Sequence, residues 1–192
     1  MTHFLTSPFT THNPTSVTMS IRNTDTMTAF ENTILSVFMH SKNTTKLSTS
    51  LSFTNTTGII PLSLHFLLQL EELQLLIDHI VSPIQQPTTI YSSIKFLTLY
   101  SNHTNTRPTL NNILNQWTFS SLQTWHMNNI HFNNTAQSFL LRHSRYLTGL
   151  HVAGSILPLP AIEPCQQLST LTLDLGNISL NLRHSHVTNI SL

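Results

Sequence analysis

The pattern x-x-Leu-x-Leu, in which other large apolar residues can replace leucine, recurs seven times along this chain. The central apolar residues of the seven copies are Leu51, Leu73, Leu97, Trp125, Leu150, Leu171 and Ile190. Successive copies are 22, 24, 28, 25, 21 and 19 residues apart. Repeats of about 20–29 residues with this pattern each form one short strand followed by a helix or turn. The recurrence therefore constrains the fold more than any single residue does.

This spacing is that of a leucine-rich repeat and predicts an α/β fold, a horseshoe-shaped solenoid with a parallel concave sheet and short convex helices or turns. A single repeat cannot bury its own apolar face, so the repeats must stack into one core. We expect about seven repeats in one domain, residues 16–192, preceded by a disordered segment at residues 1–15. The segment from Val17 to Ile21 alternates like a strand and is a candidate for a further, irregular repeat.

The shared motif position makes a specific packing prediction. We expect the sheet to be parallel and the equivalent residues to be buried in one column, namely Leu73, Leu97, Trp125, Leu150 and Leu171. Cys165 follows Pro164 just before a strand, where a buried cysteine acts as a small apolar residue.

The longer connecting segments carry helix signals. Thr28 and Glu31 have capping-box spacing and predict a helix over residues 28–41. Pro61 can begin a short helix that ends at Leu70, and a third helix follows Pro108. A fourth is capped at Asn134, and we expect it to direct Phe139, Leu140 and Leu141 inward. The last two linkers are short or rich in proline and should form loops or a single 3₁₀ turn.

The composition disfavours several ligand classes. Only 8% of the residues are charged and the net charge is +1, with Lys and Arg scattered along the chain. Such a chain has no basic patch for DNA, RNA or an anionic membrane. The longest apolar run, residues 59–76, contains Pro61 and two glutamates and is too interrupted to cross a bilayer. We therefore expect neither nucleic acid nor membrane as a partner.

The location is suggested by two further observations. Cys165 is the only cysteine, which excludes an intrachain disulfide and indicates a reducing compartment. Residues 1–14 lack the basic and continuous apolar regions of a secretory signal. We expect an intracellular protein, cytoplasmic or nuclear.

Two stretches resemble the leucine-rich part of fungal F-box-like proteins. The first, residues 113–122, contains Trp117 and Phe119, and the second, residues 136–150, contains Phe-Leu-Leu-Arg-His at 139–143. The resemblance covers roughly residues 45–192 and implies that the repeats present a substrate to a ubiquitin ligase. In that family a separate F-box holds the ligase adaptor. Residues 1–45 show no F-box pattern, so the resemblance does not extend to adaptor binding.

The residues between the motif leucines predict the binding surface. Side chains alternate along a strand, so these residues point to the concave face, opposite the core. The face is neutral, able to form hydrogen bonds and partly aromatic, which favours an unidentified protein as the partner. The expected binding residues are Glu72, Gln74, Leu76, Phe96, Thr98, Tyr100, His126, Asn128, His151, Thr172 and Asp174.

The sequence contains no catalytic or cofactor motif. His126 and His151 are predicted to lie on neighbouring strands, but two ligands do not complete a structural zinc site, so we expect no metal and no cofactor. The four glycines form no phosphate-binding loop and the few acids no nucleophile motif, so we expect no enzymatic activity. Two alternatives remain: a truncated or structural repeat fragment without independent function, and a metal-dependent enzyme.

The last motif ends at Leu192, the final residue of the sequence. An uncapped parallel strand exposes backbone donors and acceptors along one edge. The sequence therefore predicts self-association through the C-terminal end of the array.

Overall fold

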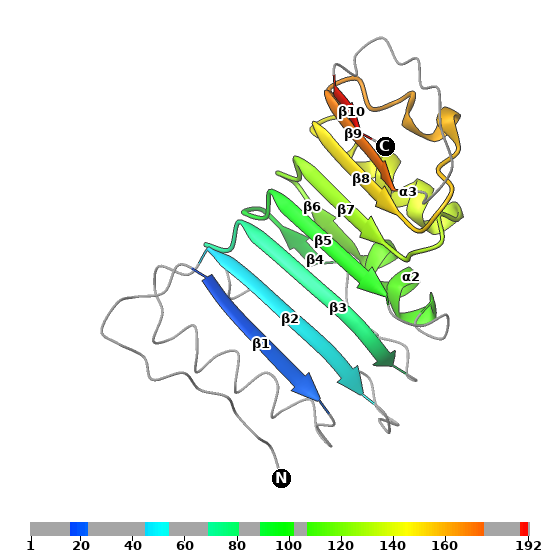
Figure 1. Ribbon diagram of the computed structural model, residues 1–192. Helices are drawn as coiled ribbons and strands as arrows, with labels where there is room; N and C mark the ends of the chain where they lie inside the picture. The colour runs from blue at the N-terminus through cyan, green and yellow to red at the C-terminus, as the bar shows by residue number, and fades with distance from the viewer. Residues whose placement is uncertain are drawn as a thin grey trace.

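A parallel β-sheet forms the centre of the molecule in the computed structural model, which describes residues 16–22, 45–53, 69–80, 89–101, 107–174 and 189–191 (Figure 1). Its strands follow the order β1-β2-β3-β5-β7-β8-β9-β10 and all neighbours are parallel. Their bounds are β1 Ser16–Arg22, β2 Lys46–Phe53, β3 Glu72–Ile80, β5 Phe96–Ser101, β7 Thr124–Asn128, β8 Gly149–Ala153, β9 Thr170–Asp174 and β10 Asn189–Ser191. The mixed α/β class and the parallel sheet are confirmed.

A second layer packs behind this sheet (Figure 1). It contains the helices α2 (Arg107–Gln116) and α3 (Asn134–His143), the 3₁₀ turn η2 (Leu159–Ile162), and a two-stranded parallel sheet made by β4 (Thr89–Tyr91) and β6 (Trp117–Phe119). The small sheet was not predicted. The solenoid architecture and the domain limits remain predictions, and the segment 1–15 lies outside the described residues.

Two columns of apolar side chains fill the space between the layers. The predicted column is confirmed: its members pair strand to strand and are at most 1% exposed, namely Leu73, Leu97, Trp125, Leu150 and Leu171. Two residues further along each strand a parallel column is equally buried, namely Leu75, Leu99, Met127, Val152 and Leu173. Period-two alternation puts both columns on the same side of the sheet.

The same backbone arrangement recurs at the start of five successive strands. The carbonyl before one strand accepts two hydrogen bonds from the first amides of the next, over 2.7–3.0 Å. The accepting carbonyls belong to Thr45, Glu71, Lys95, Gln123 and Thr148. Each of these strands is therefore joined to the preceding strand in the same way, although the segments that connect them differ in length.

The register of β2 differs from the prediction. Leu47, not Leu51, pairs with Leu73, and Leu51 pairs with Ile77. The β1 strand, predicted over residues 17–21, is present and pairs with β2. The predicted pairing of Ile190 with Leu171 is also confirmed.

Two of the four predicted helices can be compared with the structure. The helix after Pro108 corresponds to α2, and the fourth helix corresponds to α3. The N-cap of α3 is Asn133 rather than Asn134, and its side chain accepts the amides of Thr135 and Ala136 at 3.0 Å.

The predicted inward direction of Leu141 is wrong, because this residue is 45% exposed. Phe139 and Leu140 are buried, as predicted. Three consecutive residues span about 200° of a helix, so they cannot all face one layer.

The remaining linkers are only partly described. The predicted helix 28–41 lies outside the described residues, and so does most of the 61–70 helix, of which the described Gln69 and Leu70 are not helical. The proline-rich linker forms the 3₁₀ turn η2, as expected, whereas residues 175–188 lie outside the described residues. Cys165 is fully buried, and burial raises the pKa of its thiol to about 11.

An aromatic cluster joins the small sheet to the large one. Tyr91 contacts Trp117 edge-on and stacks on Phe119, both at 5.3 Å between ring centres. Phe139 of α3 then lies 6.0 Å from Phe119 and 4.7 Å from Trp125 in β7. These rings therefore connect four elements: β4, β6, β7 and α3.

His143 is the polar member of this region. It is 3% exposed and sits at the end of α3. Its Nε2 accepts the Phe119 amide at 2.9 Å, so its Nδ1 carries the proton and donates to the Phe139 carbonyl at 2.7 Å. Burial lowers the pKa of His143 to about 4; the Phe139 hydrogen bond opposes this shift and nearby Arg142 adds to it. The neutral ring is thus a fixed bridge between α3 and β6.

Candidate functional site

The candidate site is the face of the large sheet that points away from the second layer, which we call the open face. The paired strands place three rows of side chains on it. They are Glu72-Phe96-Thr124-Gly149-Thr170, Gln74-Thr98-His126-His151-Thr172 and Leu76-Tyr100-Asn128-Ala153-Asp174. All eleven predicted binding residues lie in these rows, so the predicted register of β3 to β9 is confirmed.

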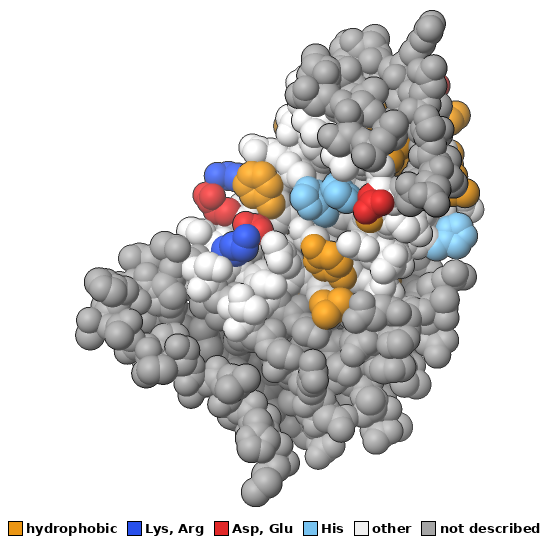
Figure 2. All heavy atoms as spheres, viewed as in Figure 1, with side chains coloured by type: hydrophobic (Ala, Val, Ile, Leu, Met, Phe, Trp, Pro, Cys, Tyr) orange, Lys and Arg blue, Asp and Glu red, His pale blue; other side chains and the backbone are white. Residues whose placement is uncertain are grey.

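Most of these side chains are accessible. Among the predicted binding residues only Thr98 is buried, at 5% exposure, whereas Phe96 is 42% exposed. Figure 2 shows this face, with histidine side chains near its middle and apolar side chains close by. In the part of the chain that the structure describes, no helix covers it (Figure 1).

The residues contributed by β2 need correction. The shared motif position of Leu51 and Leu73 predicts Ser50, Ser52 and Thr54 beside Glu72, Gln74 and Leu76. The structure instead pairs Lys46, Ser48 and Ser50 with these three residues. Thr54 lies outside the described residues. At the other end of the sheet, Asn189 and Ser191 pair with Thr170 and Thr172, which follows from the shared motif position of Ile190 and Leu171.

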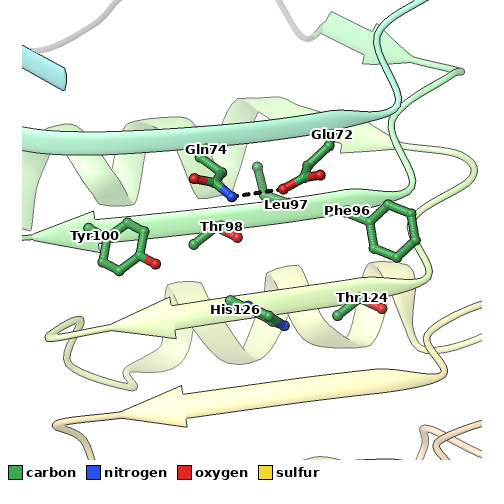
Figure 3. A pocket seen from close by; sticks show the side chains of 8 residues that line it. All are labelled: Glu72, Gln74, Phe96, Leu97, Thr98, Tyr100, Thr124 and His126. Atoms are coloured by element: carbon green, nitrogen blue, oxygen red, sulfur yellow. Dashed lines mark hydrogen bonds between the residues drawn. The ribbon is translucent and has the colours of Figure 1, made fainter. Parts of the chain in front are cut away.

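A shallow hollow of about 200 Å³ lies in the open face over β3, β5 and β7. It is lined by Glu72, Gln74, Phe96, Leu97, Thr98, Tyr100, Thr124 and His126. Figure 3 shows Phe96 and Tyr100 at its two ends, with Thr98 between them. Small-molecule pockets usually measure about 300–1,000 Å³. The hollow is therefore better suited to a single side chain of a partner.

The sequence did not predict this hollow, and it did not predict that Thr124 and Leu97 line it. The only available signal was the position of Thr124 beside Phe96 in the same row. Leu97 lies between Phe96 and Thr98 in β5 and lines the bottom of the hollow, although its side chain belongs to the buried core.

The charged groups beside the hollow neutralise one another. Glu72 Oε1 lies 2.6 Å from Lys46 Nζ and accepts a 2.7 Å hydrogen bond from Gln74 Nε2. Lys95 Nζ and Glu71 Oε1 form a second pair at 2.8 Å. Exposed pairs of this kind contribute only about 0–1 kcal/mol to stability. Only the Lys46 pair and the Gln74 hydrogen bond involve residues that line the hollow, Glu72 and Gln74.

His126 and His151 stand side by side on β7 and β8. They occupy the same rung, and their ring centres are 5.1 Å apart with the ring planes tilted by 39°. Burial lowers the pKa of His126, the positive charge of His151 lowers it further, and Glu72 opposes both effects. Within the described residues, no group of three or more His, Cys, Asp or Glu side chains is placed to hold a metal ion.

The charges around His126 predict two pKa changes of opposite sign. His151→Gln removes a like charge and should raise the pKa of His126, whereas Glu72→Gln removes a favourable charge and should lower it. Titration of the histidine ring resonances by NMR measures both changes. Equal shifts in the same direction would show that these neighbours do not set the pKa.

Comparisons with models of protein families, with curated proteins and with solved structures found no match to this chain. In the described ranges, no helix combines the length and the apolar character that crossing a membrane requires.

Proposed function

We propose that this chain is a protein-binding module of the leucine-rich-repeat type and that its open face docks a protein partner. The repeat type is supported by the two buried columns and by the bifurcated hydrogen bonds that recur at five strand starts. Apart from Thr45, the residues that make up these columns and hydrogen bonds occupy the same positions in successive copies of the sequence motif. Repeat arrays stack equivalent units and use the exposed sheet face to bind partners.

The main observation in support of this proposal is the hollow between Phe96 and Tyr100. Exposed aromatic side chains around a side-chain-sized depression are typical of the centre of protein interfaces, where a few residues supply most of the affinity. Gln74, Thr98 and Thr124 offer hydrogen-bonding groups at the same place. The neutral surroundings favour a protein over a nucleic acid, because phosphate binding requires clustered cations.

A more specific role follows from the resemblance of residues 113–150 to F-box-like proteins. On this basis the proposal includes recognition of a substrate for a ubiquitin ligase. An intracellular location, cytoplasmic or nuclear, is part of the same proposal and is supported by the single, buried Cys165.

Site-specific photocrosslinking tests the docking surface. A benzophenone amino acid replaces Phe96 in one variant and Tyr146 in another; both residues are exposed and aromatic, but Tyr146 follows α3 behind the sheet. We expect protein adducts from position 96 and not from position 146. Adding Tyr100→Ala to the first variant should reduce the adduct yield at least about tenfold, because truncating a central interface residue costs about 2 kcal/mol or more.

Equal adduct yields from positions 96 and 146, or no effect of Tyr100→Ala, would contradict docking at the hollow. Adducts with a ubiquitin ligase component or its substrates would support the more specific role. Adducts with unrelated proteins would reject that role while leaving the docking face intact.

A further inference from the structure

The two histidines on the open face have the placement of a pair of metal ligands. Parallel pairing puts His126 and His151 on one rung of adjacent strands, which are about 4.8 Å apart in a sheet. Alternation sends both side chains to the same face, and both are partly exposed. Neither side chain needs to cross the sheet to reach the other.

The separation of the rings matches shared coordination of one ion. Two imidazoles that bind an ion at about 2.0–2.1 Å, with about 109° between the bonds, have ring centres about 5.2 Å apart. The observed distance is 5.1 Å. Flat stacking at van der Waals contact would require nearly parallel planes, whereas these planes are tilted by 39°.

No side chain or backbone group of the described residues occupies the ring nitrogens. Among the described residues, neither imidazole has a hydrogen-bonding partner, unlike the buried His143, which uses both nitrogens. Thr98 and Thr172 flank the pair on the same rung. Their hydroxyl groups can bond to water bound at the ion, but they do not occupy the imidazoles.

We propose that His126 and His151 together bind one divalent transition-metal ion of the class that prefers imidazole, such as Zn²⁺, Ni²⁺ or Cu²⁺. The site is open rather than closed. The chain supplies two ligands, and the remaining positions are filled by water or by a donor atom of a docked protein. This inference does not depend on the proposed function, because the pair itself binds the ion.

Titration of the protein with ZnCl₂, followed by ¹⁵N NMR of the histidine rings, tests the site. We expect the resonances of His126 and His151 to shift together in one saturable transition. Both His126→Gln and His151→Gln should weaken zinc binding at least about tenfold, because each variant leaves only one imidazole to bind the ion instead of two. The matched control is His131→Gln, which alters another exposed histidine and should leave the transition unchanged.

The chain has twelve histidines, so the assignment of the shifts decides the result. Separate, non-saturating shifts of His126 and His151 in the unsubstituted protein would overturn the proposal whether or not the variants fold. An equal loss of affinity in His131→Gln would overturn it as well. Failure of the photocrosslinking experiment would leave this site unaffected.

Discussion

Replacing Trp125 by alanine is expected to lower the free energy of unfolding by about 3–5 kcal/mol, the usual cost of deleting a buried aromatic side chain. Trp125 is fully buried in the middle of the apolar column, between Leu97 and Leu150. It also contacts Phe139, so its loss would open a cavity between β7 and α3. Urea unfolding followed by circular dichroism measures the change.

Two further substitutions make this test specific. Ile156→Ala removes an apolar side chain that is 74% exposed and should change stability by less than about 0.5 kcal/mol. Trp125→Phe keeps an aromatic ring and deletes an indole N–H that has no partner among the described residues, so it should cost clearly less than alanine. A cost below about 1 kcal/mol for Trp125→Ala would mean that the column is not tightly packed.

Acidification from pH 6.5 to pH 4 is expected to remove about 3 kcal/mol of stability through His143 alone. The pKa of this ring falls from the ordinary 6.5 to about 4 in the folded protein. The unfolded chain therefore binds a proton at a pH where the folded chain does not. The contribution of His143 is complete above pH 6.5 and is lost as the pH falls toward 4.

The variant His143→Leu isolates this effect from other titrating groups. At neutral pH it should be less stable by about 1–3 kcal/mol, because the Phe119 amide loses its acceptor inside the protein. Its stability should nevertheless decline less between pH 6.5 and pH 4 than that of the unsubstituted protein. Urea unfolding at several pH values measures both slopes, and identical slopes would show that His143 is not the buried acid-sensitive group.

The strands and their pairing were largely predictable because the motif fixes which residue of each strand meets the core. The β2 register was not, since the only copy of the motif in this segment is Leu51-x-Phe53, whereas at Leu47 the second motif position is Thr49. A shift by an even number of residues leaves the same side chains facing the core. Only the pairing with the long β3 strand distinguishes the two registers.

The second layer was predicted less completely for two physical reasons. The strands β4 and β6 have three residues each, too few for an alternating pattern to stand out. In α3 the inward positions are Ala136, Phe139, Leu140 and His143, a regular helical spacing that ends in a polar residue. His143 therefore occupies a position where the sequence pattern would favour leucine, and Leu141 points outward instead.

The sequence predicted which side of the sheet the candidate site residues occupy, but it did not predict the hollow that they form. Alternation along the strands assigned all eleven residues to the correct side of the sheet. The hollow depends on how Phe96 and Tyr100 are oriented relative to Glu72 and Gln74, which packing determines and sequence spacing does not.

The aromatic cluster has a spectroscopic consequence. The chain has two tryptophans, Trp117 and Trp125, and both are fully buried in or beside this cluster. Their fluorescence therefore reports on the centre of the molecule and would not respond to local fraying of β1 or β2. Coincident fluorescence and circular dichroism transitions would indicate that the sheet unfolds as one cooperative unit. A dichroism change that precedes the emission change would indicate that the first strands separate from a centre that remains folded.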